Sequence, residues 1–207
     1  MKSILFNTEM VRDILDGRKT VTRRVVKPQP KGHAALLRTE FGEDAVYAFE
    51  DGTVTAPPYR HGDILYVRET WKQATCDYAG GGYGLTDVYL YKADEPIDTS
   101  EMMVEEKWHP SIHMPREAAR IFLRVTDVRV ERLQDITDIE AIKEGFEGER
   151  CNHEFSDYIG GTFACTDCMN TGWIKSPVIE FAQSWDSALN PEDYVLYGWW
   201  VTLMYGI

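Results

Sequence analysis

The chain of 207 residues is poor in positive charge. It has 22 lysines and arginines against 34 aspartates and glutamates, which gives a formal net charge of -12 at pH 7. Non-specific binding to a nucleic-acid backbone depends on many Lys and Arg contacts that displace counterions from phosphates. The composition therefore argues against non-specific DNA binding, whereas a single nucleoside or a short exposed base remains a possible ligand.

Long apolar runs are also missing, because no stretch approaches the roughly 18 to 20 residues that a membrane helix needs. The N-terminus has no charged and then apolar export signal, and the chain has no internal repeats or low-complexity tracts. We therefore expect a cytoplasmic protein that does not associate with a membrane. The length and the 43% hydrophobic content predict one folding unit with a substantial core.

Cysteines are few, and three of the four, Cys151, Cys165 and Cys168, lie close together. This distribution fits a metal site in a reducing compartment better than a disulfide framework. With His153 the three form two ligand pairs around an 11-residue loop, which predicts a structural zinc site without an open coordination position. The Cys-x-His spacing is tight, so Cys76 is an alternative to His153. A reduced apolar loop and a disulfide are the other interpretations.

The most informative segment is 17–24, Gly-Arg-Lys-Thr-Val-Thr-Arg-Arg, which gathers cations and hydroxyls in an acidic chain. Apolar residues at helical spacing between positions 10 and 15 follow a cap at Asn7, and the glycine of the segment favours the end of that helix. The valines that follow favour extended structure. The sequence therefore predicts Lys19 in a turn and Thr22 on the strand that leaves it.

Three further segments predict strands. Residues 64–69 have strong β character, and residues 119–133 show the clearest long alternation of apolar and polar side chains. The apolar run at 194–205 predicts a last strand that is buried on both faces. Weaker signals predict short strands at 46–49 and 88–91 and an acidic loop or short helix at 95–106.

Two more helices have clear start signals. Thr137 and Glu140 form a capping box, and the helix that follows ends at Gly145, which leaves Glu144 at its final turn. A second helix begins at Ser176-Pro177, where proline suits the first helical position. Strands separated by two or three helices indicate an α+β barrel.

Three motifs together resemble the ASCH domain of the PUA-like superfamily. They are Gly-Arg-Lys-Thr-Val-Thr-Arg at 17–23, His-Gly-Asp-Ile-Leu-Tyr-Val-Arg-Glu at 61–69 and Pro-Ser-Ile-His-Met-Pro-Arg at 110–116. The length and the last motif are similar to the larger phage and prophage members. The resemblance implies a small, partly open β-barrel with two to three packed helices, a cleft suited to RNA or a modified nucleobase, and loop insertions. These insertions lie at about 27–60, 72–107 and, with the zinc site, 147–175.

The resemblance also implies a catalytic set. One small bacterial ASCH protein type is an N4-acetylcytidine amidohydrolase that uses a Lys, a Thr three residues later and a distant Glu. By motif these correspond to Lys19, Thr22 and Glu144, and Glu140 and Glu69 are alternatives to Glu144.

Two divisions of labour fit these residue types. As a general base, Lys19 needs a pKa lowered from about 10.4 to about 7, at a cost of about 4 kcal/mol. In the other scheme Lys19 stays charged and holds the developing oxyanion, while Glu144 activates a water molecule. Thr22 is the nucleophile in the first scheme.

Other residues are candidates for binding the substrate. Arg23, Arg24 and Arg68 can bind a phosphate or a base edge as planar forks, and the surplus carboxylates are their alternative partners. His113 can stack on a base or serve as a hydrogen-bonded structural histidine, and Glu69 completes the predicted set.

Three functions are therefore open. The first is binding of a modified pyrimidine nucleoside or exposed RNA base, with hydrolysis of an N4-acyl group. The second is a non-catalytic RNA-binding or regulatory module in which Trp71, Tyr66 or Trp108 stacks on bases. The third is a phage accessory protein that acts through protein contacts of the acidic segments 95–106 and 147–157.

Overall fold

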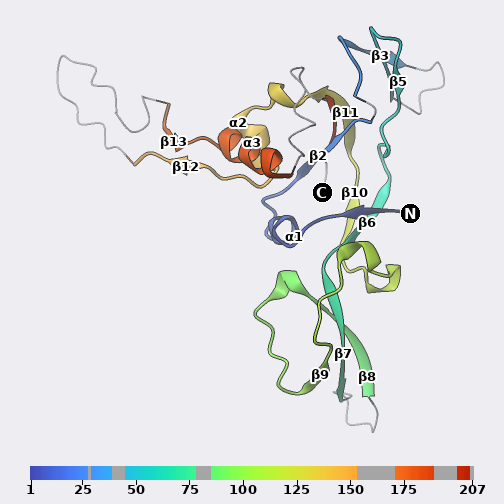
Figure 1. Ribbon diagram of the computed structural model, residues 1–207, viewed down its shortest axis with the longest axis vertical. Coiled ribbons are helices and arrows are strands. Elements are labelled where there is room, and N and C mark those ends of the chain that lie inside the picture. Colours follow the sequence, from blue (N-terminus) through green and yellow to red (C-terminus); the bar gives the residue numbers. More distant parts are fainter. Residues whose placement is uncertain (28, 39–44, 78–84, 153–170, 189–199, 206–207) are drawn as a thin grey trace, which may run out of the picture. The chain divides into compact units, whose positions relative to one another are not determined.

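The computed structural model describes residues 1–27, 29–38, 45–77, 85–152, 171–188 and 200–205 (Figure 1). These residues form three α-helices and several small sheets, which confirms the α+β class. No closed barrel is found among them. Within the same ranges, no helix has the length and the apolar composition that crossing a membrane requires.

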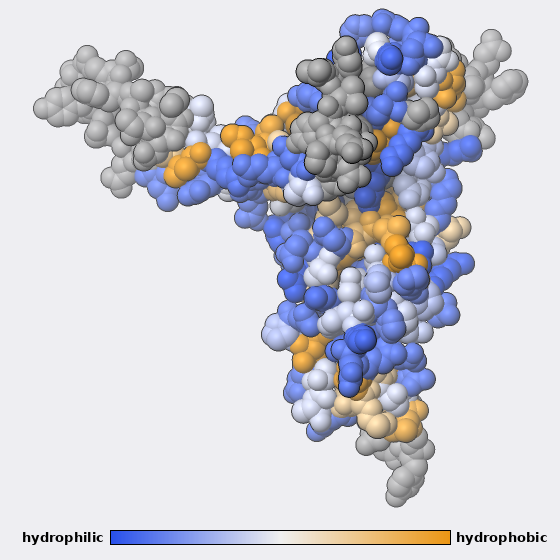
Figure 2. Space-filling model, in the orientation of Figure 1, coloured by the Kyte–Doolittle hydropathy of each residue, from blue (hydrophilic) through white to orange (hydrophobic). Residues whose placement is uncertain are grey.

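The chain forms two compact units, and each is assembled from separate chain segments. The first unit comprises Met1–Gly17, Pro58–Val128 and Tyr205–Ile207, and the second comprises Arg18–Pro57 and Arg129–Met204. Because segments of the two units alternate along the sequence, no composition change or linker marks their limits. On the face shown in Figure 2, hydrophilic residues cover most of the described surface, with smaller hydrophobic patches between them.

The first unit contains a three-stranded sheet in the order β1-β6-β10. Strand β1, Lys2–Leu5, pairs in parallel with β6, Ile64–Arg68, and β10, Phe122–Arg124, pairs with β6 in antiparallel orientation. Leu65 and Val67 of β6 are buried, as the alternation of this segment predicts. The predicted strand at 64–69 is therefore confirmed.

Helix α1, Thr8–Leu15, follows β1 and begins as predicted. The Asn7 side chain accepts a hydrogen bond of 2.8 Å from the Met10 N–H, which satisfies one of the unpaired donors of the first turn. Gly17 has a φ of 73°, a left-handed conformation that favours glycine after a helix.

A second sheet of the first unit has the order β8-β7-β9. Strand β7, Trp71–Asp77, pairs with β8, Leu85–Tyr91, and on its other side with β9, Met102–Val104. The predicted strand at 88–91 lies within β8. Strand β9 lies in the stretch predicted as an acidic loop or short helix, because pairing with β7 overrides the weak local signal. Short 3₁₀ turns at η1 Lys92–Asp94, η2 Ser111–His113 and η3 Arg116–Ala118 complete this unit.

The single long strand predicted at 119–133 is wrong. The structure has two strands there, β10 and β11, Asp127–Arg132, which belong to different sheets. Between them Val125 exchanges backbone hydrogen bonds with Gly62 and Asp63, of 2.7 and 2.9 Å. The Asp127 side chain then accepts from the next N–H, a local contact that competes with strand pairing. The alternation of apolar and polar residues indicates which side chains are buried, but it does not indicate where the chain leaves one sheet and joins another.

The second unit contains the sheets β11-β14-β2, β3-β4-β5 and β12-β13. Val26, Tyr47 and Phe49 form its small apolar cluster, against which the partly buried Val130 packs. The predicted strand at 46–49 lies within β4, and the predicted last strand is described over 200–205, its earlier part lying outside the described residues. The strands are β2 Val21–Val25, β14 Trp200–Tyr205, β3 Ala34–Arg38, β4 Ala45–Phe49, β5 Val54–Thr55, β12 Glu149–Arg150 and β13 Trp173–Lys175.

Helices α2, Asp138–Lys143, and α3, Pro177–Ala188, lie side by side in the second unit (Figure 1). The capping box of Thr137 and Glu140 is present in full, which confirms that prediction. Gly145 ends α2 with a φ of 103°, and η4 Leu133–Asp135 precedes the cap. The start of α3 is confirmed too, with Pro177 as its first residue.

Candidate functional site

Lys19 lies two residues before the start of β2 and is buried, with 1% of its surface exposed. The next residue fixes this position, because the Thr20 N–H donates a hydrogen bond of 2.7 Å to the Lys143 carbonyl at the end of α2. A buried lysine is rare unless its charge is compensated. The partner of the ammonium group is therefore the central feature of the site.

That partner is Glu144, the residue that caps the C-terminus of α2. The Lys19 Nζ donates to the Glu144 backbone carbonyl at 2.9 Å and, in a short contact, to the Oε2 of its carboxylate. Glu144 is 5% exposed. Glu144 is therefore not an ordinary exposed residue at a helix end, because its carboxylate is buried against a cation 125 residues away in sequence.

Arg23 of β2 is the second cation on the same carboxylate. Its side chain is fully buried, and its Nη1 donates to the Glu144 Oε1 at 3.2 Å. Its Nε donates to the Glu131 Oε1 at 2.9 Å, and its Nη2 lies 2.7 Å from the same oxygen and 3.4 Å from the Glu140 Oε2. Arg23 therefore joins the site to strand β11 and to helix α2.

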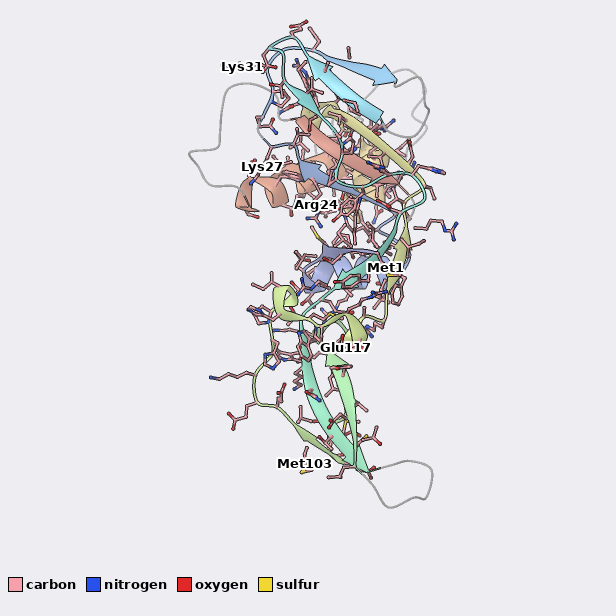
Figure 3. All side chains as sticks on the ribbon, turned by 90° about the vertical axis from the view of Figure 1, so that its right-hand side faces the viewer. Met1, Arg24, Lys27, Lys31, Met103 and Glu117 are labelled. Atoms are coloured by element: carbon pink, nitrogen blue, oxygen red, sulfur yellow. The ribbon has the colours of Figure 1, made fainter. Side chains whose placement is uncertain are left out.

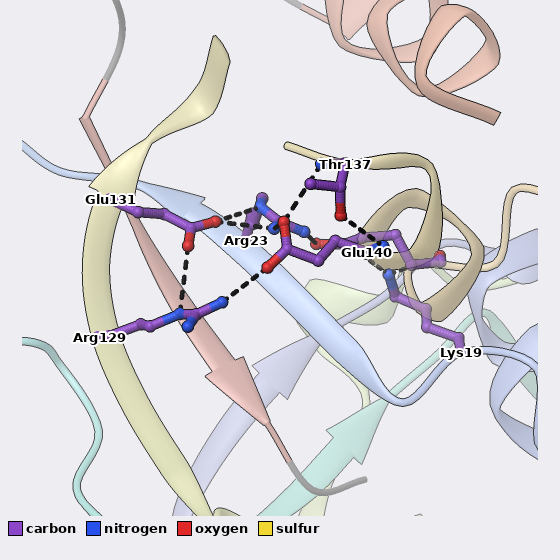
Figure 4. A network of polar contacts seen from close by, with 7 residues as sticks. Lys19, Arg23, Arg129, Glu131, Thr137 and Glu140 are labelled. Atoms are coloured by element: carbon purple, nitrogen blue, oxygen red, sulfur yellow. Dashed lines mark hydrogen bonds and ion pairs between the residues drawn. The ribbon is translucent and has the colours of Figure 1, made fainter. Parts of the chain in front are cut away.

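Arg129 closes a ring of ion pairs on β11 (Figure 4). Its Nε lies 3.2 Å from the Glu131 Oε2, and its Nη2 donates to the Glu140 Oε1 at 2.7 Å. Glu140 also serves the capping box with Thr137. We call these side chains together the Arg23 network. Its members are Lys19, Arg23 and Arg129 as cations and Glu131, Glu140 and Glu144 as carboxylates.

The network is a cluster of compensated charges that is buried at Lys19, Arg23 and Glu144 and partly exposed at Arg129. Removing one partner of a buried ion pair typically costs about 3–5 kcal/mol, because the other charge is left without compensation. Burial raises the pKa of the Glu131 carboxyl, and the neighbouring charges of Arg23 and Arg129 oppose that rise without cancelling it. Each charged group of the network therefore has at least one partner of opposite charge within it.

Thr22 is also buried on β2, with 3% of its surface exposed. Successive side chains of a strand point to opposite faces, so Thr22 lies on the other face of β2 from Arg23. Among the residues that the structure describes, no hydrogen bond joins its hydroxyl to Lys19 or Glu144. The structure thus brings two members of the predicted catalytic set into contact, and the role of Thr22 stays a prediction.

The predicted substrate-binding arginines have different surroundings. The forked head of Arg23 is directed at carboxylates, as the alternative interpretation of the arginines expected. Arg24, the next residue of β2, is half-buried and is followed by the exposed Lys27 and Lys31 (Figure 3). Arg68, in the first unit, donates from Nε to the Met114 carbonyl at 3.1 Å and from Nη2 to the carbonyl of Ile112.

Glu69 belongs to a second buried ion cluster, in the first unit. It is 1% exposed, and the Nε and Nη2 of Arg120 each donate to one of its oxygens at 2.9 Å. Arg120 also pairs with Asp94 at 2.6 Å and lies 3.9 Å from the centre of the Tyr91 ring. Burial lowers the pKa of Arg120, but the hydrogen bonds and charges of Glu69 and Asp94 raise it above its usual value overall.

His113, the last predicted binding residue, is exposed in the short turn η2 of the first unit. A substrate contact by this histidine stays a prediction.

The predicted zinc ligands His153, Cys165 and Cys168 lie outside the described residues. Cys151 is half-buried, and its backbone N–H donates to the Gly172 carbonyl at 3.1 Å. Cys76 lies in β7, where its Sγ is 3.8 Å from the Thr86 carbonyl. In the described part of the chain, no group of three or more His, Cys, Asp or Glu side chains could hold a metal. Zinc binding stays a prediction.

Sequence reasoning missed several members of the two clusters, namely Arg129, Glu131, Arg120 and Asp94. Arg129 and Glu131 alternate along β11, and alternate residues of a strand share one face. Two opposite charges on one face of a partly buried strand are a signal that could have found them. Arg120 lies outside the helices and strands, and Asp94 ends the short 3₁₀ turn η1, so the sequence holds no comparable pattern for either.

Comparisons of the chain with protein families, with curated proteins and with solved structures find no match.

Proposed function

We propose that this chain is an ASCH protein of the PUA-like superfamily that binds a modified pyrimidine nucleoside or an exposed RNA base and hydrolyses an N4-acylcytidine amide. The observation that supports it most is the buried contact between Lys19 and Glu144. The resemblance singles out these two residues from the sequence alone. Their positions, 125 residues apart in sequence, meet in the fold.

The contacts of Lys19 favour the scheme in which the lysine stays charged and Glu144 activates a water molecule. Its Nζ donates both to a backbone carbonyl and to a carboxylate, and both acceptors stabilise the charged ammonium. A charged lysine can donate to the oxygen of the amide carbonyl as negative charge develops there. Glu144, which accepts from Lys19 in the free protein, is then the group that takes a proton from water.

The proposed reaction balances with water alone. The water oxygen attacks the acyl carbon and gives one proton to Glu144, while the negative charge on the carbonyl oxygen is held by Lys19. The bond between the acyl carbon and N4 then breaks, and N4 receives the proton that Glu144 had accepted. The products are a carboxylic acid and cytidine. Thr22 has no obligatory part in this sequence.

Two lysine variants test this assignment with N4-acetylcytidine as substrate and chromatography of cytidine as the assay. Lys19→Arg keeps a positive charge and a donor, whereas Lys19→Met has neither. We expect Lys19→Arg to retain measurable activity and Lys19→Met to fall by about 100-fold or more, the typical cost of a lost oxyanion donor. Absence of cytidine with the unmodified protein would overturn the proposed activity, and equal loss in both variants would overturn the role of the charge.

A non-catalytic RNA-binding role is the second candidate, and an aromatic cluster in the first unit favours it. The Trp71 ring lies 4.9 Å from that of His109 and 5.6 Å from that of Tyr89, and Lys72 lies 4.5 Å from the centre of the Trp108 ring. Half-buried aromatic rings beside a cation are groups on which unpaired bases stack. Titration of a fluorescent single-stranded RNA at several salt concentrations tests this role, because polymer binding weakens steeply with salt.

A further inference from the structure

The carboxylate of Glu144 is shared between two cations that contact different oxygens. Lys19 binds Oε2, and Arg23 approaches Oε1 with its Nη1 at 3.2 Å. A carboxylate bound at both oxygens is fixed in the rotation about its terminal bond, which is otherwise broad. The orientation of Oε2 toward Lys19 therefore depends on what holds Oε1.

We propose that Arg23 is a positioning residue, which holds the Glu144 carboxylate in the orientation that its reaction with water requires. This inference rests on the proposed function for the reaction itself. Arg23 acts through Glu144 and not on the substrate, because its donors are directed at the carboxylates of the Arg23 network. The predicted role of Arg23 in binding a phosphate or base edge is replaced by this one.

Arg23 is suited to this task because it is itself held in place. Its Nε donates to the Glu131 Oε1 at 2.9 Å, its Nη2 lies 2.7 Å from the same oxygen in an ion pair, and its guanidinium lies 5.8 Å from the centre of the Phe181 ring. The planar fork of an arginine can serve Glu131 and Glu144 at the same time from a rigid frame. A lysine at this position keeps the charge but has a single nitrogen, so it cannot hold both carboxylates in the same geometry.

The alternative explanation is that Arg23 only stabilises the packing of helix α2 against the sheet. A comparison with Arg129 distinguishes this structural role from the positioning role. Arg129 belongs to the same ring and contacts Glu131 and Glu140 at 3.2 and 2.7 Å. Neither of these carboxylates is the one assigned to the reaction with water. A purely structural role predicts similar consequences for Arg23→Lys and Arg129→Lys, whereas the positioning role predicts a difference confined to Arg23.

The first test is the steady-state hydrolysis of N4-acetylcytidine by both variants. For Arg23→Lys we expect kcat to fall by about 10-fold to 100-fold while KM changes by less than about threefold, the pattern of an interaction needed in the transition state. For Arg129→Lys we expect kcat within about threefold of the unmodified protein at a comparable loss of thermal stability. Equal losses of kcat in the two variants would overturn the proposal.

The second test needs no activity and so separates this inference from the proposed function. Two double-mutant cycles of urea unfolding combine Lys19→Met with Arg23→Lys and with Arg129→Lys. If Lys19 and Arg23 are coupled through Glu144, the first cycle should show a coupling of about tenfold in the unfolding equilibrium constant, and the second less than about threefold. Equal coupling in both cycles would contradict the positioning role even in a protein without hydrolytic activity.

A further variant keeps both tests decisive if Arg23→Lys does not fold. Glu131→Gln leaves Arg23 in place but removes the charge that anchors its Nε and Nη2. We expect Glu131→Gln to lower kcat in the same direction by about threefold to tenfold, with KM unchanged. An unaltered kcat in this variant would show that the anchoring of Arg23 has no part in the reaction.

Discussion

Two buried glutamates of this chain, Glu69 and Glu144, are held in different ways. Both oxygens of Glu69 are bound by one guanidinium, that of Arg120, in a parallel fork with two distances of 2.9 Å. The oxygens of Glu144 are divided between Lys19 and Arg23. In the fork one side chain satisfies both oxygens of Glu69, whereas each oxygen of Glu144 has a different cation as its partner. Under the proposed function, Glu144 reacts with water, whereas Glu69 stabilises the first unit.

The cations that bind the two glutamates also differ in the partners that remain to them when the glutamate is replaced. Arg120 is 27% exposed and keeps Asp94 as a second partner. Lys19 and Arg23 have almost no exposed surface, and within the described part of the chain Arg23 then keeps the carboxylates of Glu131 and Glu140. Solvent can therefore compensate Arg120 but not Lys19.

The largest expected difference follows from this contrast. Glu144→Gln removes the buried negative charge that contacts both Lys19 and Arg23, so we expect the free energy of unfolding to fall by about 3–5 kcal/mol. Glu69→Gln should cost less, about 1–3 kcal/mol, because Arg120 can turn toward water and Asp94. Urea unfolding of both variants at pH 7 measures the two losses. A larger loss for Glu69→Gln would contradict the distinction between the two sites.

A smaller loss of stability is expected when the arginine that forks onto Glu69 is replaced by a residue that keeps its positive charge. Arg120→Lys replaces two parallel hydrogen bonds with one and weakens the contact with the Tyr91 ring. We expect a loss of about 1–2 kcal/mol in the free energy of unfolding. The exposed Arg116→Lys serves as the matched control and should unfold as the unmodified protein does. A loss of stability in Arg120→Lys no larger than that in Arg116→Lys would show that the fork does not stabilise the first unit.

The N-terminal cap of α2 is expected to contribute to the stability of the Arg23 network. Thr137→Ala removes the hydroxyl that accepts from the Glu140 N–H, and we expect a loss of about 1 kcal/mol in the free energy of unfolding. Glu140 also contacts Arg23 and Arg129, so a loose cap disturbs the network at one corner. Thr137→Ser, which keeps the hydroxyl, is the control for denaturation measurements. Equal stability of the two variants would show that the cap contributes little.

The smallest expected effect is a pH dependence. Burial raises the pKa of Glu131 in the folded protein above 4.5, its usual value, despite the opposing charge of Arg23. A carboxyl group with a raised folded pKa favours the folded state below its unfolded pKa, and this contribution is lost as the pH rises through the folded pKa. The stability of the unmodified protein relative to Glu131→Gln should therefore fall as the pH rises above about 4.5. Urea unfolding at pH 4, 5, 6 and 7 measures this difference, and a rise with pH would contradict the assignment.

Local signals in the sequence were enough to predict the ends of the helices. The cap at Asn7, the capping box at Thr137 and the end of α2 at Gly145 depend only on neighbouring residues, and the structure confirms each of them. The pairing of Lys19 with Glu144 came from the family resemblance and not from a local pattern. Lys19 lies in the motif at 17–23, whereas Glu144 lies in none of the three motifs and was placed by its position at the end of the helix that follows residues 119–133.

Features that depend on distant partners were not predictable in the same way. Strand β9 forms because β7 offers it an edge, and the segment 119–133 is divided because Val125 bonds to Asp63 and Gly62. The ring around Arg23 joins β2, β11 and α2, and no local pattern specifies which carboxylates a buried arginine meets. Tertiary pairing decided these cases against the local preference.

The most direct test of the central claim compares Glu144→Gln with Glu147→Gln as catalysts of N4-acetylcytidine hydrolysis. Glu147 is exposed, lies three residues further along the chain and pairs with Arg18 at 3.5 Å, so it is a matched control near the same helix end. With both variants shown to be folded by circular dichroism at the assay temperature, we predict a loss of about 100-fold or more for Glu144→Gln and less than about threefold for Glu147→Gln. A folded Glu144→Gln variant as active as Glu147→Gln would contradict the assignment of Glu144 as the reacting carboxylate.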